Sequence, residues 1–261
     1  MIKNKKMSGQ LFSITNKLIL ITGSARGIGF ILAKGMGLEG AKVIINDINL
    51  GNIEKALSEL FSLGIKAYGY QFDITNESQV IDGIESIRKD LGEIDVLINN
   101  AGIQIRHPAE EFPIEDYEKI LSVNLKGAFI VSKVVGQSMI KKCSGKIINI
   151  CSMQSELGRN SITPYAASKG GLKMMTKGFA TEWGKYNIQV NGIGPGYFIT
   201  DMTKSLVEDK IFNAWLCNRT PANRWGDPKE LIGTAIFLSS EASGYINGQI
   251  IYVDGGMLAC V

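Results

Sequence analysis

Short, nearly continuous apolar runs alternate with longer amphipathic segments over most of the chain, from residue 17 to residue 253. The runs are rich in isoleucine, valine and leucine, a composition typical of strands that are buried on both faces. We expect strands, the last three less clearly marked, at 18–21, 43–45, 96–98, 147–150, 67–72, 188–193 and 249–253. The helical period of the intervening segments predicts helices at 28–38, 53–63, 79–91, 115–142 and 163–185.

This alternation predicts an α/β fold with a single Rossmann-type, doubly wound parallel sheet of about seven strands and helices on both faces. We find no internal repeat, low-complexity tract or linker, so we expect one domain over residues 1–261. Residues 195–227 interrupt the alternation, and we expect them to form a helical lid over a substrate cavity. Residues 1–12 begin with several lysines and no long apolar stretch follows, so we expect a solvated tail.

Composition and charge exclude several classes of protein. The 261 residues carry a net charge of only +3 from interspersed charges, which gives no reason to expect nucleic acid as a partner. No apolar run approaches ~20 residues, so we expect no membrane span. Four cysteines without close spacing fit a reducing cytoplasm, and a single histidine makes a His-rich metal site or a Ser-His-Asp triad difficult to build. We therefore expect a cytoplasmic protein without a bound metal.

Tyr165 and Lys169 are the most informative pair of residues. On a helix, side chains four positions apart share one face, so the phenol and the ammonium can point into one cavity. A free tyrosine has a pKa near ~10, and bringing it to about 7 requires roughly 4 kcal/mol. One ammonium about 4 Å away supplies roughly that much at an effective dielectric of ~20. The spacing therefore predicts a proton-transfer pair in which Lys169 lowers the pKa of Tyr165.

A glycine-rich turn follows the first predicted strand and opens a helix, with glycines at 23, 27 and 29. Such a turn lets a pyrophosphate approach the backbone amides of the helix N-terminus. Asp47 ends the second strand about twenty residues later, where a carboxylate binds the ribose hydroxyls and favours NAD. Arg26 favours NADP because a guanidinium binds a 2′-phosphate. We expect NAD or NADP, without a preference between them.

Together with Asn99-Asn100-Ala101-Gly102 and the Tyr165-x-x-x-Lys169 spacing, these features make nearly the whole chain resemble the short-chain dehydrogenase/reductase family. The resemblance implies an NAD(P)-dependent oxidoreductase with a catalytic tetrad of Asn124, Ser152, Tyr165 and Lys169. It also implies a homotetramer or dimer. The implied cofactor-binding residues are Gly23, Ser24, Arg26, Gly27, Ile28, Gly29, Asp47, Asp73, Ile74, Asn100, Ala101, Gly102, Tyr165, Lys169, Pro195, Gly196 and Thr200.

Each member of the tetrad has an expected role. Tyr165 is the general acid or base, and Lys169 lowers its pKa and contacts the nicotinamide ribose. Ser152 hydrogen bonds to the reacting oxygen. Asn124 anchors a water chain behind Lys169.

Three segments at the expected cavity mouth, 99–108, 151–159 and 214–228, resemble family members that interconvert D-gluconate and 5-keto-D-gluconate. A sugar acid needs a cation for its carboxylate and hydrogen-bonding side chains for its hydroxyls. We expect Arg106 to bind the carboxylate, because a guanidinium binds a carboxylate bidentately. We expect Gln154 to hydrogen bond to a hydroxyl. Ser152 and Tyr165 complete the expected substrate site, and Arg159 is a second candidate cation.

Alternative functions remain open at this point. The same chemistry can act on a deoxy-keto-gluconate such as 2-dehydro-3-deoxy-gluconate, on another polyol or on a 3-ketoacyl thioester, since substrate loops vary on this fold. A different class is a dinucleotide-binding protein that has lost catalysis. The intact tetrad argues against that class, because a sensor needs no proton-transfer pair.

Overall fold

A computed structural model describes residues 10–200 and 203–260. Most of the predicted tail, two residues of the predicted lid and Val261 therefore lie outside the described residues. The predicted α/β fold is confirmed: seven parallel strands form one sheet in the order β3-β2-β1-β4-β5-β6-β7. The strands are β1 Leu18–Ile21, β2 Lys42–Asp47, β3 Ala67–Gln71, β4 Val96–Asn99, β5 Gly145–Ile150, β6 Ile188–Pro195 and β7 Ile250–Val253.

The central strands are buried on both faces, as their continuous apolar sequences predict. In β1, Ile19 and Ile21 belong to one hydrophobic core, whereas Leu18 and Leu20 belong to a second core on the other face. This follows from the two-residue repeat of a strand, which sends successive side chains to opposite faces. The sheet therefore requires a helical layer on each side.

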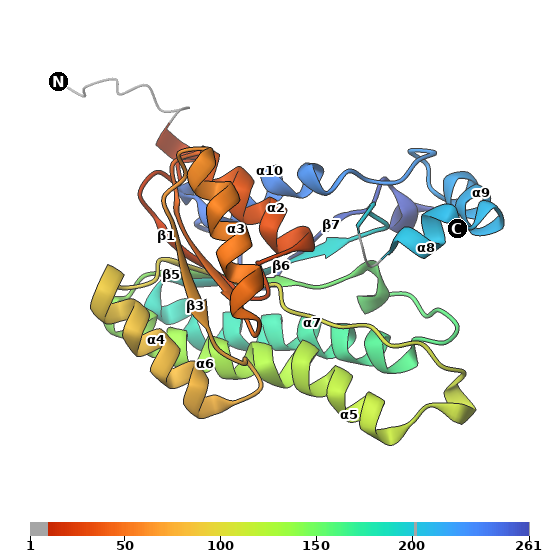
Figure 1. The fold of residues 1–261 in the computed structure, drawn as a ribbon, viewed down its shortest axis with the longest axis horizontal. Helices are drawn as coiled ribbons and strands as arrows, with labels where there is room; N and C mark the ends of the chain where they lie inside the picture. Colours follow the sequence, from red (N-terminus) through yellow and green to blue (C-terminus); the bar gives the residue numbers. More distant parts are fainter. Residues whose placement is uncertain (1–9, 201–202, 261) are drawn as a thin grey trace.

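Figure 1 shows those two layers, with α2, α3 and α10 above the sheet and α4, α6 and α7 below it. The helices above contribute Leu32, Ala56 and Leu238 to the first core. Those below contribute Ile84 and Val135, among others, to the second. The bounds are α2 Gly27–Leu38, α3 Leu50–Ser62, α4 Glu77–Leu91, α6 Ala128–Lys142, α7 Thr163–Trp183 and α10 Ile232–Ser239.

The prediction of a single helix at 115–142 was wrong in one respect. The segment comprises α5 Ile114–Leu121, a π-helical turn Ser122–Gly127 and then α6. A π turn widens the helix locally, and such turns are frequent at functional sites. Here the turn contains Asn124, which hydrogen bonds to the backbone of Ile103. The apolar period of the sequence did not reveal this long-range contact.

The predicted lid segment contains two short helices, α8 Lys204–Glu208 and α9 Lys210–Arg219. Asp209 is the N-cap of α9, and its carboxylate accepts hydrogen bonds from the amides of Ile211 and Phe212. Leu216 of α9 packs with Trp225 and with Met153, which follows β5. The segment is therefore anchored beside the carboxyl end of the sheet by its own small apolar cluster.

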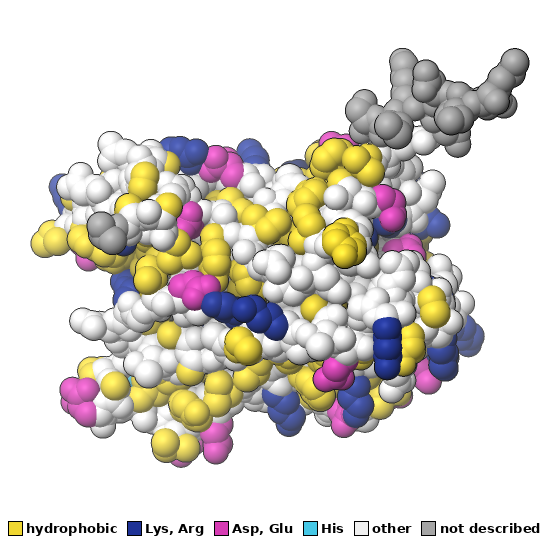
Figure 2. Space-filling view, turned by 180° about the vertical axis from the view of Figure 1, so that it is seen from behind, with side chains coloured by type: hydrophobic (Ala, Val, Ile, Leu, Met, Phe, Trp, Pro, Cys, Tyr) yellow, Lys and Arg dark blue, Asp and Glu magenta, His cyan; other side chains and the backbone are white. Residues whose placement is uncertain are grey.

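Figure 2 shows lysine, arginine and acidic side chains interspersed on the rear face of the molecule, with apolar side chains between them. This agrees with the small net charge of +3. Within the described ranges, no helix is long and apolar enough to span a bilayer.

Candidate active site

Most of the predicted site residues lie at or just beyond the carboxyl ends of the parallel strands. The glycine turn follows β1, Asp47 ends β2, Asn100 follows β4, Ser152 follows β5 and Pro195 ends β6. Carboxyl ends of parallel strands share one edge of the sheet, so segments far apart in sequence meet there. The fold therefore brings the predicted nucleotide and catalytic residues to one side of the molecule.

Two glycines in the first turn have the left-handed backbone conformation that favours glycine. Gly23 has a φ of +59°, and a Cβ there would lie 2.8 Å from the Ala101 Cα. Gly27 has a φ of +61°, but no atom lies within 4 Å of a Cβ built there. Gly23 is therefore required by packing, whereas Gly27 faces open space that a phosphate group can approach.

The N-terminus of α2 differs from those of its neighbours. Asn49 and Asn76 cap α3 and α4 by accepting a hydrogen bond from a first-turn amide. Arg26 occupies the same position before α2 and makes no side-chain cap. The first amides of α2 and its dipole are thus available to an anion beside the open Gly27. This geometry fits the pyrophosphate of a dinucleotide.

Asn100 joins the turn after β4 to the glycine turn. Its Nδ2 donates to the carbonyl oxygens of Thr22 and Gly23, each at 2.9 Å. The Thr22 hydroxyl in turn accepts from the amides of Asn100 and Ala101, each at 3.1 Å. The two turns form one rigid unit, which agrees with the predicted position of Asn100, Ala101 and Gly102 behind the nucleotide.

The predicted adenosine contacts come from the ends of β2 and β3, the two strands on one side of β1. Asp47 is half-buried, and its Oδ1 accepts from the Asn49 amide at 3.0 Å. Asp73 Oδ1 accepts from both the amide and the hydroxyl of Thr75, each at 2.8 Å, while the adjacent Ile74 is buried. The Arg26 side chain is exposed at the start of α2. The structure thus holds both the carboxylate that favours NAD and the guanidinium that favours NADP.

The predicted nicotinamide segment follows β6. The Gly196 amide donates to the carbonyl oxygen of Val253 at 2.9 Å, and a Cβ on Gly196 would lie 2.7 Å from the Asp254 Cα. Thr200 donates its amide to the Thr203 hydroxyl at 2.9 Å. The chain leaving Pro195 is therefore packed closely against β7 and then turns into the predicted lid.

Tyr165 and Lys169 lie on one face of α7, as their spacing predicts, and Pro164 occupies the first helical turn. The Lys169 Nζ lies 5.8 Å from the centre of the Tyr165 ring and donates to the carbonyl oxygen of Ile150 at 2.7 Å. The pair is close enough to share one cavity, and Lys169 is held by the end of β5.

The expected lowering of the Tyr165 pKa by Lys169 was wrong for this structure. Burial raises the pKa of Tyr165, and a hydrogen bond with the Ser152 side chain opposes that change. Burial also lowers the pKa of Lys169 to about 8. Burial disfavours the charged form of both groups, and the Lys169 ammonium donates to the Ile150 carbonyl. Tyr165 therefore keeps its proton at neutral pH.

Ser152 and Asn124 are both buried beside α7. The Ser152 hydroxyl accepts from the Gln154 amide at 3.1 Å, which fixes its position after β5. Asn124 donates to the Ile103 carbonyl and to the Ser168 hydroxyl and accepts from the Ile103 amide. The Asn124 amide therefore connects the π turn, the loop after β4 and α7. The structure shows it in these contacts, and its predicted water chain stays a prediction.

Arg159, the second candidate cation, contacts two aromatic side chains of the predicted lid. Arg159 donates to the Tyr197 hydroxyl at 3.0 Å, and its guanidinium carbon lies 4.5 Å from the centre of the Phe212 ring. Burial and the nearby positive charge of Arg159 lower the pKa of Arg106, so the two guanidinium groups lie within electrostatic reach of each other. The Gln154 Oε1 is buried and has no hydrogen-bond partner among the described residues. It is an acceptor that a substrate hydroxyl can satisfy.

Sequence reasoning did not single out Tyr197 and Phe212. The only available signal was the position of Tyr197 directly after Pro195-Gly196, within a segment predicted as a lid. The His107 Nε2 lies 3.0 Å from a carboxylate oxygen of Asp116, and the His107 ring makes an edge contact with the Phe112 ring. These contacts hold the loop after β4.

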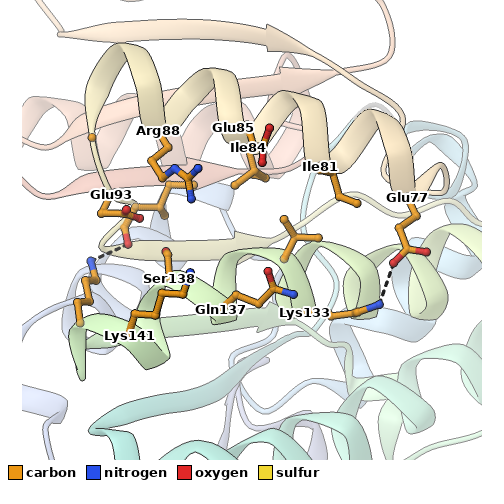
Figure 3. Close-up of a pocket in the computed structure, with 14 residues that line it drawn as sticks. Glu77, Ile81, Ile84, Glu85, Arg88, Glu93, Lys133, Gln137, Ser138 and Lys141 are labelled. Atoms are coloured by element: carbon orange, nitrogen blue, oxygen red, sulfur yellow. Dashed lines mark hydrogen bonds and ion pairs between the residues drawn. The ribbon is translucent and has the colours of Figure 1, made fainter.

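A separate surface cavity of about 490 Å³ lies between α4 and α6 (Figure 3). Glu77 and Lys133 face each other across one end of it and form an ion pair at 2.8 Å. None of the predicted site residues lines this cavity. Over the part of the chain that the structure describes, no group of three or more His, Cys, Asp or Glu side chains is arranged to hold a metal ion.

A family model described as short chain dehydrogenase matches residues 17–211, which is most of the chain. The chain belongs to this family. The 5-keto-D-gluconate 5-reductase of Escherichia coli strain K12 is 57% identical over 251 residues, covering 96% of this chain and 99% of that protein. The 2-dehydro-3-deoxy-D-gluconate 5-dehydrogenase of Formosa agariphila is 51% identical over 257 residues, covering 98% of this chain and 97% of that protein.

Among solved structures of this family, a gluconate 5-dehydrogenase from Burkholderia cenocepacia, in complex with NADP and tartrate, superimposes with a TM-score of 0.94. It is 46% identical and covers 97% of this chain and 99% of that one. Family membership and the confirmed fold together establish an oxidoreductase of the short-chain dehydrogenase type that acts on a CH–OH group.

Proposed function

We propose that the protein interconverts D-gluconate and 5-keto-D-gluconate with NADP or NAD as the hydride carrier. The observation that carries this proposal is the pair of guanidinium groups, Arg106 and Arg159, beside Tyr197 of the predicted lid. Burial raises the pKa of Tyr197, the charges of Arg159 and Arg106 oppose that rise, and Tyr197 in turn lies within electrostatic reach of Tyr165. A carboxylate held by the arginines would thus lie near the predicted proton donor. The 57% identical reductase and the gluconate 5-dehydrogenase structure support this substrate class.

The residues at the sheet edge fit a nicotinamide dinucleotide. The open space at Gly27 and the uncapped first turn of α2 suit the pyrophosphate, whereas Asp47 or Arg26 would contact the adenosine ribose or its 2′-phosphate. A bound nicotinamide would supply or accept the hydride. The NADP-bound relative shows that the family fold accommodates the phosphorylated form. We propose that the other cofactor residues named from the sequence complete this site.

The side chains around Tyr165 suit proton donation to a carbonyl oxygen. Because the raised pKa keeps Tyr165 protonated, the phenol would donate its proton to the ketone oxygen as that oxygen gains negative charge. In the opposite direction, Tyr165 would first lose its proton, a charged Lys169 would stabilise the resulting phenolate, and that phenolate would then accept the hydroxyl proton. Ser152 would hold the reacting oxygen beside the phenol.

A turnover panel tests this function. The purified protein should reduce 5-keto-D-gluconate and oxidise D-gluconate, as measured by nicotinamide absorbance with NADPH, NADH and their oxidised forms. The panel should include 2-dehydro-3-deoxy-D-gluconate, its 5-oxidised partner, a neutral polyol and a 3-ketoacyl thioester. A kcat/KM for gluconate and 5-keto-gluconate that does not exceed those for the other substrates would refute the assignment.

The 51% identical Formosa relative favours a second candidate, the deoxy-keto-gluconate reaction. That substrate is also a sugar acid, so the two arginines fit it equally well. The two substrates differ in their hydroxyl and keto groups, and the panel therefore separates them. The intact tetrad still argues against a dinucleotide-binding protein without catalysis, and complete absence of turnover with nucleotide binding retained would favour that class.

The remaining predictions form part of the same proposal. We infer one catalytic domain over residues 1–261, in which 195–227 act as the substrate lid; the apolar cluster around Leu216 and Trp225 supports this role. A cytoplasmic location is supported by the four cysteines, all of which are free thiols. A homotetramer or dimer is supported by exposed apolar side chains on α6 and α7.

A further inference from the structure

The Arg159 side chain is held by two aromatic residues of the predicted lid. Its Nη1 donates to the Tyr197 hydroxyl at 3.0 Å. Its guanidinium carbon lies 4.5 Å from the centre of the Phe212 ring and 5.6 Å from that of Tyr197. The two rings meet edge to face, with centres 5.7 Å apart. Arg159 therefore has a defined position although it lies in the loop between β5 and α7.

This arrangement leaves guanidinium donors unused. A guanidinium has five N–H donors, and the Tyr197 hydroxyl takes one of them. Contact with an aromatic ring covers the face of the guanidinium plane, whereas a carboxylate binds along its edge. Among the described residues, neither Arg159 nor Arg106 forms an ion pair with a carboxylate. The cluster is therefore a cationic site without an internal anion.

Arg106 belongs to the same site through a backbone contact. The amide of its neighbour His107 donates to the carbonyl oxygen of Ser161 at 3.2 Å, which ties the loop after β4 to the loop that carries Arg159. Burial and the charge of Arg159 lower the pKa of Arg106. Two like charges brought together at a partly buried position destabilise each other, and a bound anion relieves that repulsion.

We infer that Tyr197 and Phe212 are positioning residues that hold Arg159 beside Arg106, so that the two guanidinium groups select substrates with a carboxylate at that end. This inference rests on the proposed function and adds two lid residues and their role to it. Tyr197 accepts from Arg159 and keeps its own O–H to donate to the bound carboxylate or a neighbouring hydroxyl. Because both aromatic residues belong to the lid segment, the position of the lid and the position of Arg159 depend on each other.

The test compares D-gluconate with D-gluconamide, which has the same hydroxyl groups and a neutral amide. In Arg159→Met, the KM for gluconate should rise roughly tenfold or more, because charge-assisted hydrogen bonds are lost. The KM for gluconamide and the kcat for both substrates should change by less than about threefold. Tyr197→Phe, which removes only one hydroxyl, should raise the gluconate KM by a smaller factor. It should likewise leave the gluconamide KM nearly unchanged. The gluconate KM of Arg159→Lys should lie between those of Arg159→Met and the wild type, because lysine keeps the positive charge but lacks the planar guanidinium.

Arg88→Met is the matched control. Arg88 is an exposed arginine on α4 that lines the separate cavity between α4 and α6, where no predicted site residue lies, so its loss should leave both KM values unchanged. Equal losses on gluconate and gluconamide in Arg159→Met and Tyr197→Phe would overturn the inference and indicate a purely structural clamp. If Arg159→Met does not fold, Tyr197→Phe decides between these outcomes.

Direct binding separates this inference from the proposed function. Calorimetry of the protein saturated with oxidised nucleotide should show tighter binding of gluconate than of gluconamide, and Arg159→Met should reduce that preference. If the wild type has this preference but does not turn over gluconate, the proposed function fails and the inference stands. If the wild type binds gluconate no more tightly than gluconamide, the inference fails whatever the turnover.

Discussion

At the scale of single residues, burial controls the charge state of the predicted catalytic pair. Lys169 is almost fully buried and donates to a backbone carbonyl, so its pKa falls to about 8. The pKa of Tyr165 rises for the same reason. The hydrogen bond with the Ser152 side chain opposes this rise.

Removal of the Tyr165 hydroxyl tests its role as proton donor and acceptor. Tyr165→Phe should lower kcat by the ~10²–10⁴ that is typical of general acid-base groups. The Kd for the nucleotide, measured by fluorescence titration, should change little, because the ring and the helix remain. Near-normal turnover in this variant would exclude Tyr165 from the mechanism.

Asp47 is the residue at which cofactor preference can be changed. Its half-buried carboxylate ends β2 and would repel a 2′-phosphate. Asp47→Ala should therefore raise the ratio of kcat/KM with NADP to that with NAD, and Arg26→Ala should lower it. An unchanged ratio in Asp47→Ala would show that Arg26 or other groups decide the preference.

At the scale of elements, helix ends and one irregular turn determine what the site can bind. Asparagine caps satisfy first-turn amides at the N-termini of α3 and α4, whereas α2 has no side-chain cap next to the open Gly27. The π turn before α6 carries Asn124, whose amide joins three segments of the site. The asparagine caps stabilise α3 and α4, whereas the first amides of α2 remain available to an anion.

The contribution of the α4 cap to stability can be tested. Asn76→Ala should lower the free energy of unfolding by about 1 kcal/mol, since the Gln79 amide loses its acceptor. Asn76→Asp should keep most of the stability, because aspartate caps about as well. Urea denaturation of the three proteins measures the difference. A loss below about 0.3 kcal/mol in Asn76→Ala would contradict the assigned role.

At the scale of the whole molecule, two hydrophobic cores hold seven strands in one sheet, and the site forms at its carboxyl edge. Some apolar side chains remain exposed on the helices below the sheet. Phe129 on α6 is 46% exposed and Met174 on α7 is 61% exposed. Phe129 also borders a cavity that Leu125 and Met175 help to line. This apolar surface is the kind that self-association covers.

We therefore expect sedimentation equilibrium at micromolar concentration to give two or four chain masses. Phe129→Glu should weaken the association, because a charge would replace an apolar contact. Phe61→Glu is the matched control, since Phe61 is 56% exposed but lies on α3, on the other side of the sheet. A single chain mass for the wild type would contradict the expected dimer or tetramer.

The sequence by itself determined the fold class, because continuous β-rich runs separated by helical periods have few stable arrangements other than a covered parallel sheet. It also singled out Tyr165, Lys169, the glycine turn and Arg106 as candidates, since local spacing and motif order are visible along the chain. The tertiary structure decided the rest. The π turn at Asn124, the pKa shifts of the catalytic pair and the Arg159–Tyr197–Phe212 cluster all depend on contacts between distant segments and on burial. No local pattern encodes these contacts, because they arise only when the carboxyl ends of the strands meet.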